Sequence, residues 1–144
     1  MWTNPTGLWI RSDSQGDGHF GARRGKRRHA GLDLLCKPGQ PVVSPCAAQV
    51  TRLAFPYEGA FEWKGLLLKN GPYAVKLFYL EPDESLIGQW IEEGQVLGHA
   101  QDISKRYGAE MLPHIHIEIR AEGTRTNPEP FFFFPKEEHH ERTA

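Results

Sequence analysis

The stretch Leu112-Pro113-His114-Ile115-His116-Ile117-Glu118-Ile119 decides the fold expected for this chain. Isoleucine alternates with polar residues at a period of two, which is typical of a half-buried β-strand whose successive side chains point to opposite faces. The isoleucines are expected to face a core, and His114, His116 and Glu118 to share the other face. Two histidines on one strand face indicate either an ordinary polar surface of an antiparallel sheet or a site for metal binding and proton transfer.

The composition restricts the class of protein. A chain of 144 residues suffices for one domain with a single core. Its formal net charge of −1 gives no general reason to bind nucleic acid or an anionic membrane. The 15 glycines and 11 prolines indicate many turns, which favours a β-rich fold. The two cysteines, Cys36 and Cys46, are too few for a disulfide framework, so we interpret them as buried small hydrophobes in a reduced compartment, with a single bridge as the alternative.

Targeting signals and membrane spans are not expected. No apolar run approaches the roughly 18 residues of a membrane-spanning helix. The N-terminus lacks a basic segment followed by an apolar one, so the sequence predicts no signal peptide and synthesis in the cytoplasm. An extracellular role would then require release by lysis, a dedicated non-classical secretion route or delivery by a phage.

Short strands and turns are expected along most of the chain. Asn70-Gly71 is a strong hairpin signal and joins two of the strands. Four consecutive phenylalanines, Phe131 to Phe134, must be buried or contact a partner, because four exposed ones would favour aggregation. Strands are predicted within residues 42–45, 47–55, 65–68, 73–80 and 91–98, and a helical turn or loop at 101–110. The predicted organisation is an irregular lead-in over residues 1–17, a single domain over 18–135 and a charged tail over 136–144.

Residues 18–28 form a glycine-punctuated basic loop. It contains five basic side chains within Arg23-Arg24-Gly25-Lys26-Arg27-Arg28. One interpretation is a solvated loop, and the other is an electrostatic guide for an anionic partner such as a cell-wall polymer or nucleic acid. The sequence has neither interleaved aromatic residues nor a recognised nucleic-acid motif here, so no nucleic-acid partner is expected.

A second group of polar residues suggests a metal site. In an extended chain His29, Gly31 and Asp33 share one face, and the glycine is expected to leave room for an ion. A third ligand from His114 or His116 would give three protein ligands and one position for water, the composition of a catalytic zinc site. The other histidine would transfer protons beside the metal. Glu118 would either orient a ligand imidazole or remain a solvated strand residue.

Together these residues resemble the lysostaphin-type zinc endopeptidases, many of which cut peptide cross-links of bacterial peptidoglycan. The resemblance extends from about Gly18 to Pro130. It implies a mainly β, compact, antiparallel, hairpin-rich single domain with a groove over the zinc. It also implies hydrolysis of peptidoglycan peptide bonds by a metal-activated water, with zinc as the cofactor. The segments that carry the resemblance are His29-x-Gly31-x-Asp33, His114-x-His116, Phe20-Gly21, Arg24, Gly39 to Pro45, Gly94 to Gly98 and Asn127-Pro128. The residue roles it implies are zinc binding by His29, Asp33 and His116 and catalysis by His114.

The chain departs from that family at Tyr79. This residue stands where a second catalytic histidine is usual, in a Tyr-x-His-Leu-like stretch. The leukocyte cell-derived chemotaxins share this change and are secreted zinc-binding relatives regarded as lacking peptidase activity. The chain resembles them in Asp33 to Cys36, Val75 to Leu80 and His114 to Glu118. A neutral phenol is a poor base but can donate a hydrogen bond to an oxyanion, so Tyr79 is expected to replace the histidine in catalysis. The alternative function is a catalytically degenerate zinc-binding recognition module. The oligomeric state is left open.

Overall fold

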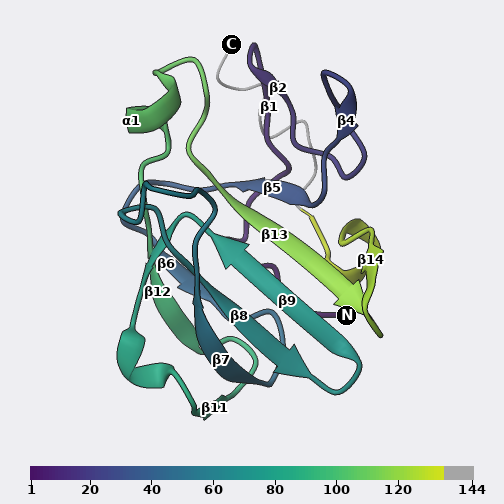
Figure 1. The fold of residues 1–144 in the computed structure, drawn as a ribbon, viewed down its shortest axis with the longest axis vertical. Helices are drawn as coiled ribbons and strands as arrows, with labels where there is room; N and C mark the ends of the chain where they lie inside the picture. Colours follow the sequence, from purple (N-terminus) through teal and green to yellow (C-terminus); the bar gives the residue numbers. More distant parts are fainter. Residues whose placement is uncertain (135–144) are drawn as a thin grey trace.

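The computed structural model describes residues 1–134 as an assembly of antiparallel strands with few helical turns (Figure 1). The largest sheet has seven strands, and its central members come from the predicted hairpin around Asn70-Gly71 and from the isoleucine-rich stretch. Its order is β11 (Trp90–Ile91), β7 (Ala48–Ala54), β8 (Gly65–Asn70), β9 (Tyr73–Phe78) and β13 (His114–Ala121), after which β5 (Leu32–Leu35) and β14 (Thr124–Thr126) both pair with the free edge of β13.

Smaller units complete the described part of the chain. A three-stranded sheet consists of β10 (Leu80–Pro82), β12 (Val96–Ala100) and β6 (Pro41–Val43). Two short hairpins, β1 (Ser12–Asp13) with β2 (Gly16–Asp17) and β3 (Arg23–Arg24) with β4 (Arg27–Arg28), lie near β5 at the top of Figure 1. The helical turns are α1 (Ser104–Tyr107), η1 (Glu84–Leu86) and η2 (Glu129–Phe131). Within residues 1–134, no helix is long and apolar enough to cross a membrane.

The alternation along β13 produces the expected two faces. Ile115, Ile117 and Ile119 are fully buried in the hydrophobic core. They pack with apolar side chains of the neighbouring strands, so burial of one face fixes which residues the other face presents. His114 and His116 therefore lie on the opposite face, where β5 pairs with both and β9 pairs with His116.

The strand predicted over 73–80 is interrupted. β9 ends at Phe78, and Tyr79 adopts a positive φ of 74°. The chain then leaves the large sheet, and β10 pairs with β12 instead. The prediction of one continuous strand is wrong at this point because the alternation of side chains does not reveal a change of sheet.

The first 17 residues are less irregular than expected. They contain the β1–β2 hairpin, and Ile10 belongs to the core and bridges Leu34. At the other end Phe132 is buried and Trp2 packs against it, whereas Phe133 is 72% exposed, so burial does not extend to all four phenylalanines. The expected charged tail, residues 136–144, and the last domain residue, 135, lie outside the described residues.

Both cysteines are buried free thiols in the structure. Burial, with the nearby carboxylate of Asp102, raises the pKa of the Cys36 thiol to about 12. Burial likewise raises the pKa of Cys46 to about 11. These groups therefore act as small hydrophobic core residues, as the first interpretation of the sequence proposed.

Candidate metal centre

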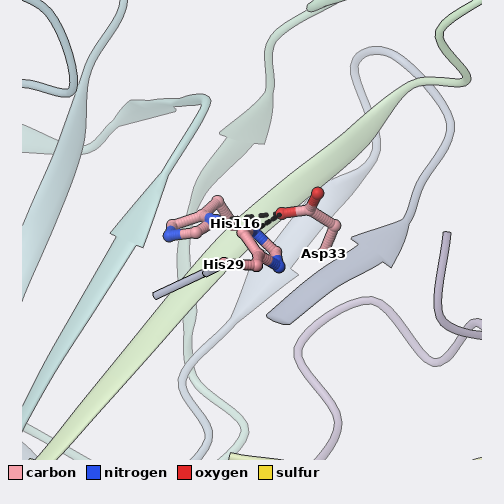
Figure 2. Close-up of side chains that lie close together, drawn as sticks. All are labelled: His29, Asp33 and His116. Atoms are coloured by element: carbon pink, nitrogen blue, oxygen red, sulfur yellow. Dashed lines mark hydrogen bonds and ion pairs between the residues drawn. The ribbon is translucent and has the colours of Figure 1, made fainter. Parts of the chain in front are cut away.

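Strand register brings the predicted metal-ligating residues together. β5 and β13 pair antiparallel with Asp33 directly opposite His116. His29 lies just before β5, where its amide donates to the carbonyl of Ala22 at 2.7 Å and its own carbonyl accepts from Gly21 at 2.9 Å. These backbone bonds direct the His29 ring to the same side of β13 as Asp33 (Figure 2).

Three potential ligand atoms converge in this arrangement. Nε2 of His29 lies 3.2 Å from Nδ1 of His116 and 3.2 Å from Oδ1 of Asp33. Nδ1 of His116 lies 2.9 Å from the same Asp33 oxygen. Tetrahedral zinc with bonds of about 2.0–2.1 Å would separate its ligands by about 3.3 Å. The triangle therefore has nearly the size that a zinc ion requires.

Neighbouring acceptors determine which nitrogens are free to bind. Nδ1 of His29 lies 3.0 Å from the carbonyl oxygen of His19, so it carries the hydrogen and donates it. Nε2 of His116 lies 2.9 Å from Oε2 of Glu118 and donates to it. When both rings are neutral, as metal binding requires, their remaining nitrogens present lone pairs beside the Asp33 carboxylate. Three lone pairs at such short range repel one another unless a cation lies among them, so the set of donors fits a metal ion.

The charges around the triangle favour a cation in the same way. Burial alone would raise the pKa of Asp33, but hydrogen bonds from His116 and His29 hold it well below its usual range. Burial alone would lower the pKa of His116, but its contacts with Asp33 and Glu118 raise it to about 9. Without a metal ion, the ionised carboxylate of Asp33 is therefore balanced by positive charge on His116, and a bound metal ion would supply that charge instead.

Gly31 has a different role from the one expected. A Cβ at this position would lie 2.3 Å from the carbonyl oxygen of Ile117 and 2.8 Å from Nε2 of His116. The space left by the missing side chain is therefore filled by β13 and the His116 ring rather than by an ion. The expectation that Gly31 makes room for the metal is wrong, because the glycine instead permits the close approach of the strand that carries a ligand.

Arg11 binds the Asp33 carboxylate through the oxygen that faces away from the two histidines of the triangle. Its side chain is 2% exposed, and its Nε donates to Oδ2 of Asp33 at 3.1 Å. Its Nη1 donates to Asp13 at 2.8 Å. This pairing leaves Oδ1 of Asp33 for the triangle and ties the β1–β2 hairpin to β5. Arg11 could not be recognised from the sequence, because an isolated arginine in a polar segment carries no periodic signal.

His114 lies beside the triangle rather than in it. It is 3% exposed, and its Nδ1 donates to the carbonyl of Leu112 at 2.8 Å. Its Nε2 is therefore unprotonated and lies 3.7 Å from Oδ2 of Asp33. Burial lowers the pKa of His114, which keeps the ring neutral at pH 7. A neutral imidazole with a free Nε2 is suited to accept a proton.

Tyr79 reaches the same region from the end of β9. Its ring is perpendicular to that of His114, with centroids 5.5 Å apart. Its hydroxyl lies 2.8 Å from the hydroxyl of Tyr57, which in turn lies 2.6 Å from the hydroxyl of Tyr107. Burial raises the pKa of Tyr79 to about 12, so the phenol remains a hydrogen-bond donor at neutral pH. Tyr57 comes from the loop between β7 and β8 and Tyr107 from the end of α1, and no local pattern in the sequence connects them.

A single groove of about 430 Å³ joins these elements, a volume within the range of peptide and small-molecule sites. Metal-centre residues lie along it together with the tyrosines and three arginines of the β3–β4 hairpin. The lining residues are Arg11, Gln15, Arg24, Arg27, Arg28, His29, Ala30, Asp33, Pro56, Tyr57, Phe78, Tyr79, Tyr107, Met111, His114, His116 and Glu118.

Comparisons with known proteins agree with this architecture. The chain is 31% identical over 107 residues to leukocyte cell-derived chemotaxin-2 of Mus musculus, covering 74% of this chain and 69% of that protein. The catalytic domain of the antimicrobial peptidase lysostaphin from Staphylococcus simulans superimposes with a TM-score of 0.58 at 20% identity, covering 83% of this chain and 90% of that one. Csd3 of Helicobacter pylori gives a TM-score of 0.63 at 18% identity, covering 91% of this chain but 35% of Csd3.

The structural likenesses confirm the mainly β, lysostaphin-type fold that the sequence predicted. At these low identities they concern the fold alone, so assignment to a family depends on the sequence. Residues 27–128 match the sequence profile of peptidase family M23, and this span contains the three candidate ligand residues together with His114 and Tyr79. The chain therefore belongs to peptidase family M23, as its motifs had indicated.

Proposed function

We propose that this protein is a zinc-dependent endopeptidase that hydrolyses peptide bonds of bacterial peptidoglycan. The observation that carries the proposal is the convergence of three ligand atoms from His29, Asp33 and His116 within 4.8 Å of one another, on the wall of a groove. Zinc bound there would lower the pKa of a water molecule toward neutrality and polarise the scissile carbonyl. Membership of peptidase family M23 supports the same reaction class.

His114 and Tyr79 would supply the remaining chemistry. The unprotonated Nε2 of His114 accepts a proton from the attacking water and later gives it to the leaving amine. The hydroxyl of Tyr79, a donor at pH 7, hydrogen-bonds to the carbonyl oxygen as negative charge develops on it. Glu118 holds the His116 ring in the tautomer that exposes Nδ1.

The experiment is digestion of purified peptidoglycan with and without a chelator, between about pH 6 and 9, where a neutral imidazole is available. We expect soluble fragments with new amino groups, no new reducing ends, and loss of release on chelation. His114→Ala should abolish release while zinc content stays unchanged. His99→Ala, which removes an exposed histidine outside the groove, is the matched control.

The second candidate function is a zinc-binding recognition module without turnover. The observation that favours it is that Tyr79 replaces the usual histidine and its hydroxyl is already paired with Tyr57. A zinc-loaded protein that binds peptidoglycan but releases no fragments would support this function over the peptidase. If zinc content survives the double change His29→Ala with Asp33→Ala, the metal assignment itself is wrong.

A further inference from the structure

We infer that the β3–β4 hairpin is a carboxylate-binding wall of the groove, and that the peptide recognised there carries a free carboxylate near the bond to be cut. The part of this inference that concerns cleavage rests on the proposed function. The binding of acidic peptides can be tested without turnover. The residues concerned are Arg24, Arg27 and Arg28, to which neither the fold nor the metal centre assigns a role.

The hairpin concentrates positive charge without balancing it. Five of the chain's 17 basic residues lie between Arg23 and Arg28, although the whole chain has a net charge of −1. Register places Arg23 opposite Arg28 and Arg24 opposite Arg27. Like charges directly opposite one another destabilise a strand pair. An arrangement of this kind is stabilised when an anion lies beside it.

Acidic partners for these side chains are scarce among residues 1–134. Arg24 has one distant carboxylate, Oδ2 of Asp33 at 3.7 Å, which Arg11 already binds at 3.1 Å. Within the same described part of the chain, neither Arg27 nor Arg28 has a carboxylate within ion-pair distance. Arg28 donates from Nη1 to the carbonyl of Gly21 at 3.4 Å, and its other donors, like those of Arg27, remain available to an incoming ligand.

The position of the hairpin directs this charge to the groove. Arg24, Arg27 and Arg28 line the same groove as His29 and His116. Arg24 is held in place, because its Nη2 donates to the carbonyl of Asp17 at 2.8 Å. His29 follows β4 directly, so the basic wall and the metal ligand are consecutive in the chain. A carboxylate on the wall would thus lie close to the reacting part of a bound peptide.

The chemistry of the ligand follows from guanidinium geometry. A guanidinium group offers planar, paired N–H donors that bind both oxygens of a carboxylate. A neutral amide in place of the carboxylate offers one oxygen and no negative charge. Peptides with free side-chain or terminal carboxylates therefore fit the wall, whereas their amidated equivalents lose the charge-assisted bonds. The basic loop is interpreted here as a determinant of substrate choice rather than as a solvated loop.

The test compares two fluorescein-labelled probes by fluorescence anisotropy on the zinc-loaded protein. One probe is Ala-Glu-Lys-Ala with a free C-terminus, and the other is Ala-Gln-Lys-Ala with a C-terminal amide. We expect the acidic probe to bind about tenfold more tightly at low salt. The preference should shrink severalfold when salt shortens the screening length below about 10 Å.

Variants separate the local effect from overall charge. Arg27→Gln with Arg28→Gln should abolish the preference. Arg52→Gln with Lys69→Gln removes the same charge from exposed positions outside the groove and should retain it. Arg27→Lys with Arg28→Lys keeps the positive charge but removes the planar guanidinium donors. This variant should therefore retain part of the preference for the acidic probe. The comparison of the two probes on the wild-type protein tests the inference even if a variant fails to fold.

The outcomes distinguish this inference from the proposed function. Equal binding of the two probes, or no binding of the acidic probe at millimolar concentration, overturns the inference even if peptidoglycan is cleaved. A carboxylate preference without any cleavage supports the carboxylate wall and leaves the protein as a recognition module. Tighter binding of a single-stranded oligonucleotide than of the acidic probe, lost in the Arg27→Gln/Arg28→Gln variant, would assign the wall to nucleic acid and overturn the inference.

Discussion

Tyr79 combines an unfavourable backbone with a central position in the groove. A bulky residue at φ 74° is a genuine outlier, and such a conformation costs on the order of 1–3 kcal/mol. Two backbone bonds hold it, since its amide donates to Lys64 at 2.8 Å and its carbonyl accepts from Gln101 at 2.9 Å. The kink turns the phenol toward His114. Strain located at the edge of a site suggests that the orientation of this ring serves the site.

The change Tyr79→Phe tests whether the hydroxyl acts in catalysis. Removal of one oxyanion donor typically costs about 10²–10³ in kcat. We expect a loss of that size with KM nearly unchanged and the ring packing preserved. Steady-state kinetics on a soluble peptidoglycan fragment would measure it. Tyr73→Phe, which alters a hydroxyl outside the groove, is the control. Unchanged kcat in the Tyr79 variant would show that another group stabilises the oxyanion.

Gly31→Ala tests the close approach of β13 to the segment between two ligands. The added Cβ would lie 2.3 Å from a backbone oxygen of Ile117, which cannot move away like a side-chain end. We expect a loss of roughly 1–3 kcal/mol in the free energy of unfolding and a reduced zinc content, because the His116 ring must shift. Urea unfolding and elemental analysis measure these two quantities.

The control for this change is Gly59→Ala. Gly59 has a φ of 75°, but no atom lies within 4 Å of its added Cβ. Its cost should be about 1–2 kcal/mol from backbone conformation alone, with full zinc content. Undiminished zinc content in Gly31→Ala would contradict the steric argument.

Candidate ligands could be named from the sequence, but the residues that hold them in place could not. His29, Asp33 and the pair His114 and His116 are recognisable as candidates from short alternating patterns. The alternation does not choose between the two histidines of the pair, whereas the register of β5 and β13 sets His116 opposite Asp33. Arg11 and Tyr57 act through contacts between distant segments, and nothing in their neighbourhoods marks them. The role of Gly31 was predicted wrongly because a strand far along the chain occupies the space beside it.

Among the strands, β13 organises the others. It pairs with β9, β5 and β14, so its alternation sets the orientation of three neighbours. The strands of four or more residues could therefore be predicted from alternation and from the Asn70-Gly71 turn. The separation of the three-stranded sheet from the seven-stranded one could not, because the chain passes from one to the other at the kink at Tyr79. The contribution of the β1–β2 hairpin was also missed, because strands of two residues carry no periodicity.

That hairpin is joined to β5 by a buried ion pair, and Arg11→Ala tests this connection. The change leaves Asp33 and Asp13 without their guanidinium partner. Breaking a buried pair by removing one member typically costs about 3–5 kcal/mol. We expect a loss of this size in urea unfolding of the metal-free protein. Arg11→Lys should recover only part, because an ammonium group lacks the fork that reaches both carboxylates.

An exposed arginine on the same molecule gives the comparison. Arg52→Ala should change the free energy of unfolding by no more than about 0.5 kcal/mol. A loss below about 1 kcal/mol in Arg11→Ala would mean that the hairpin and β5 are held together by packing rather than by this ion pair.

For the entire domain, metal binding and folding are expected to be linked. The three ligands come from segments separated by more than 80 residues in the chain, His29 and Asp33 on one side and His116 on the other. The triangle therefore exists only in the folded state, and an ion bound there stabilises that state alone. Free zinc at a hundredfold excess over its Kd would add about 2.7 kcal/mol, which corresponds to a rise in Tm of about 10 °C for a domain of this size. Thermal unfolding with zinc and with a chelator measures the shift. His116→Ala should remove the shift in Tm, and His99→Ala should retain it. An equal shift in both variants would place the metal elsewhere. No shift in the wild-type protein would mean that the metal does not stabilise the fold.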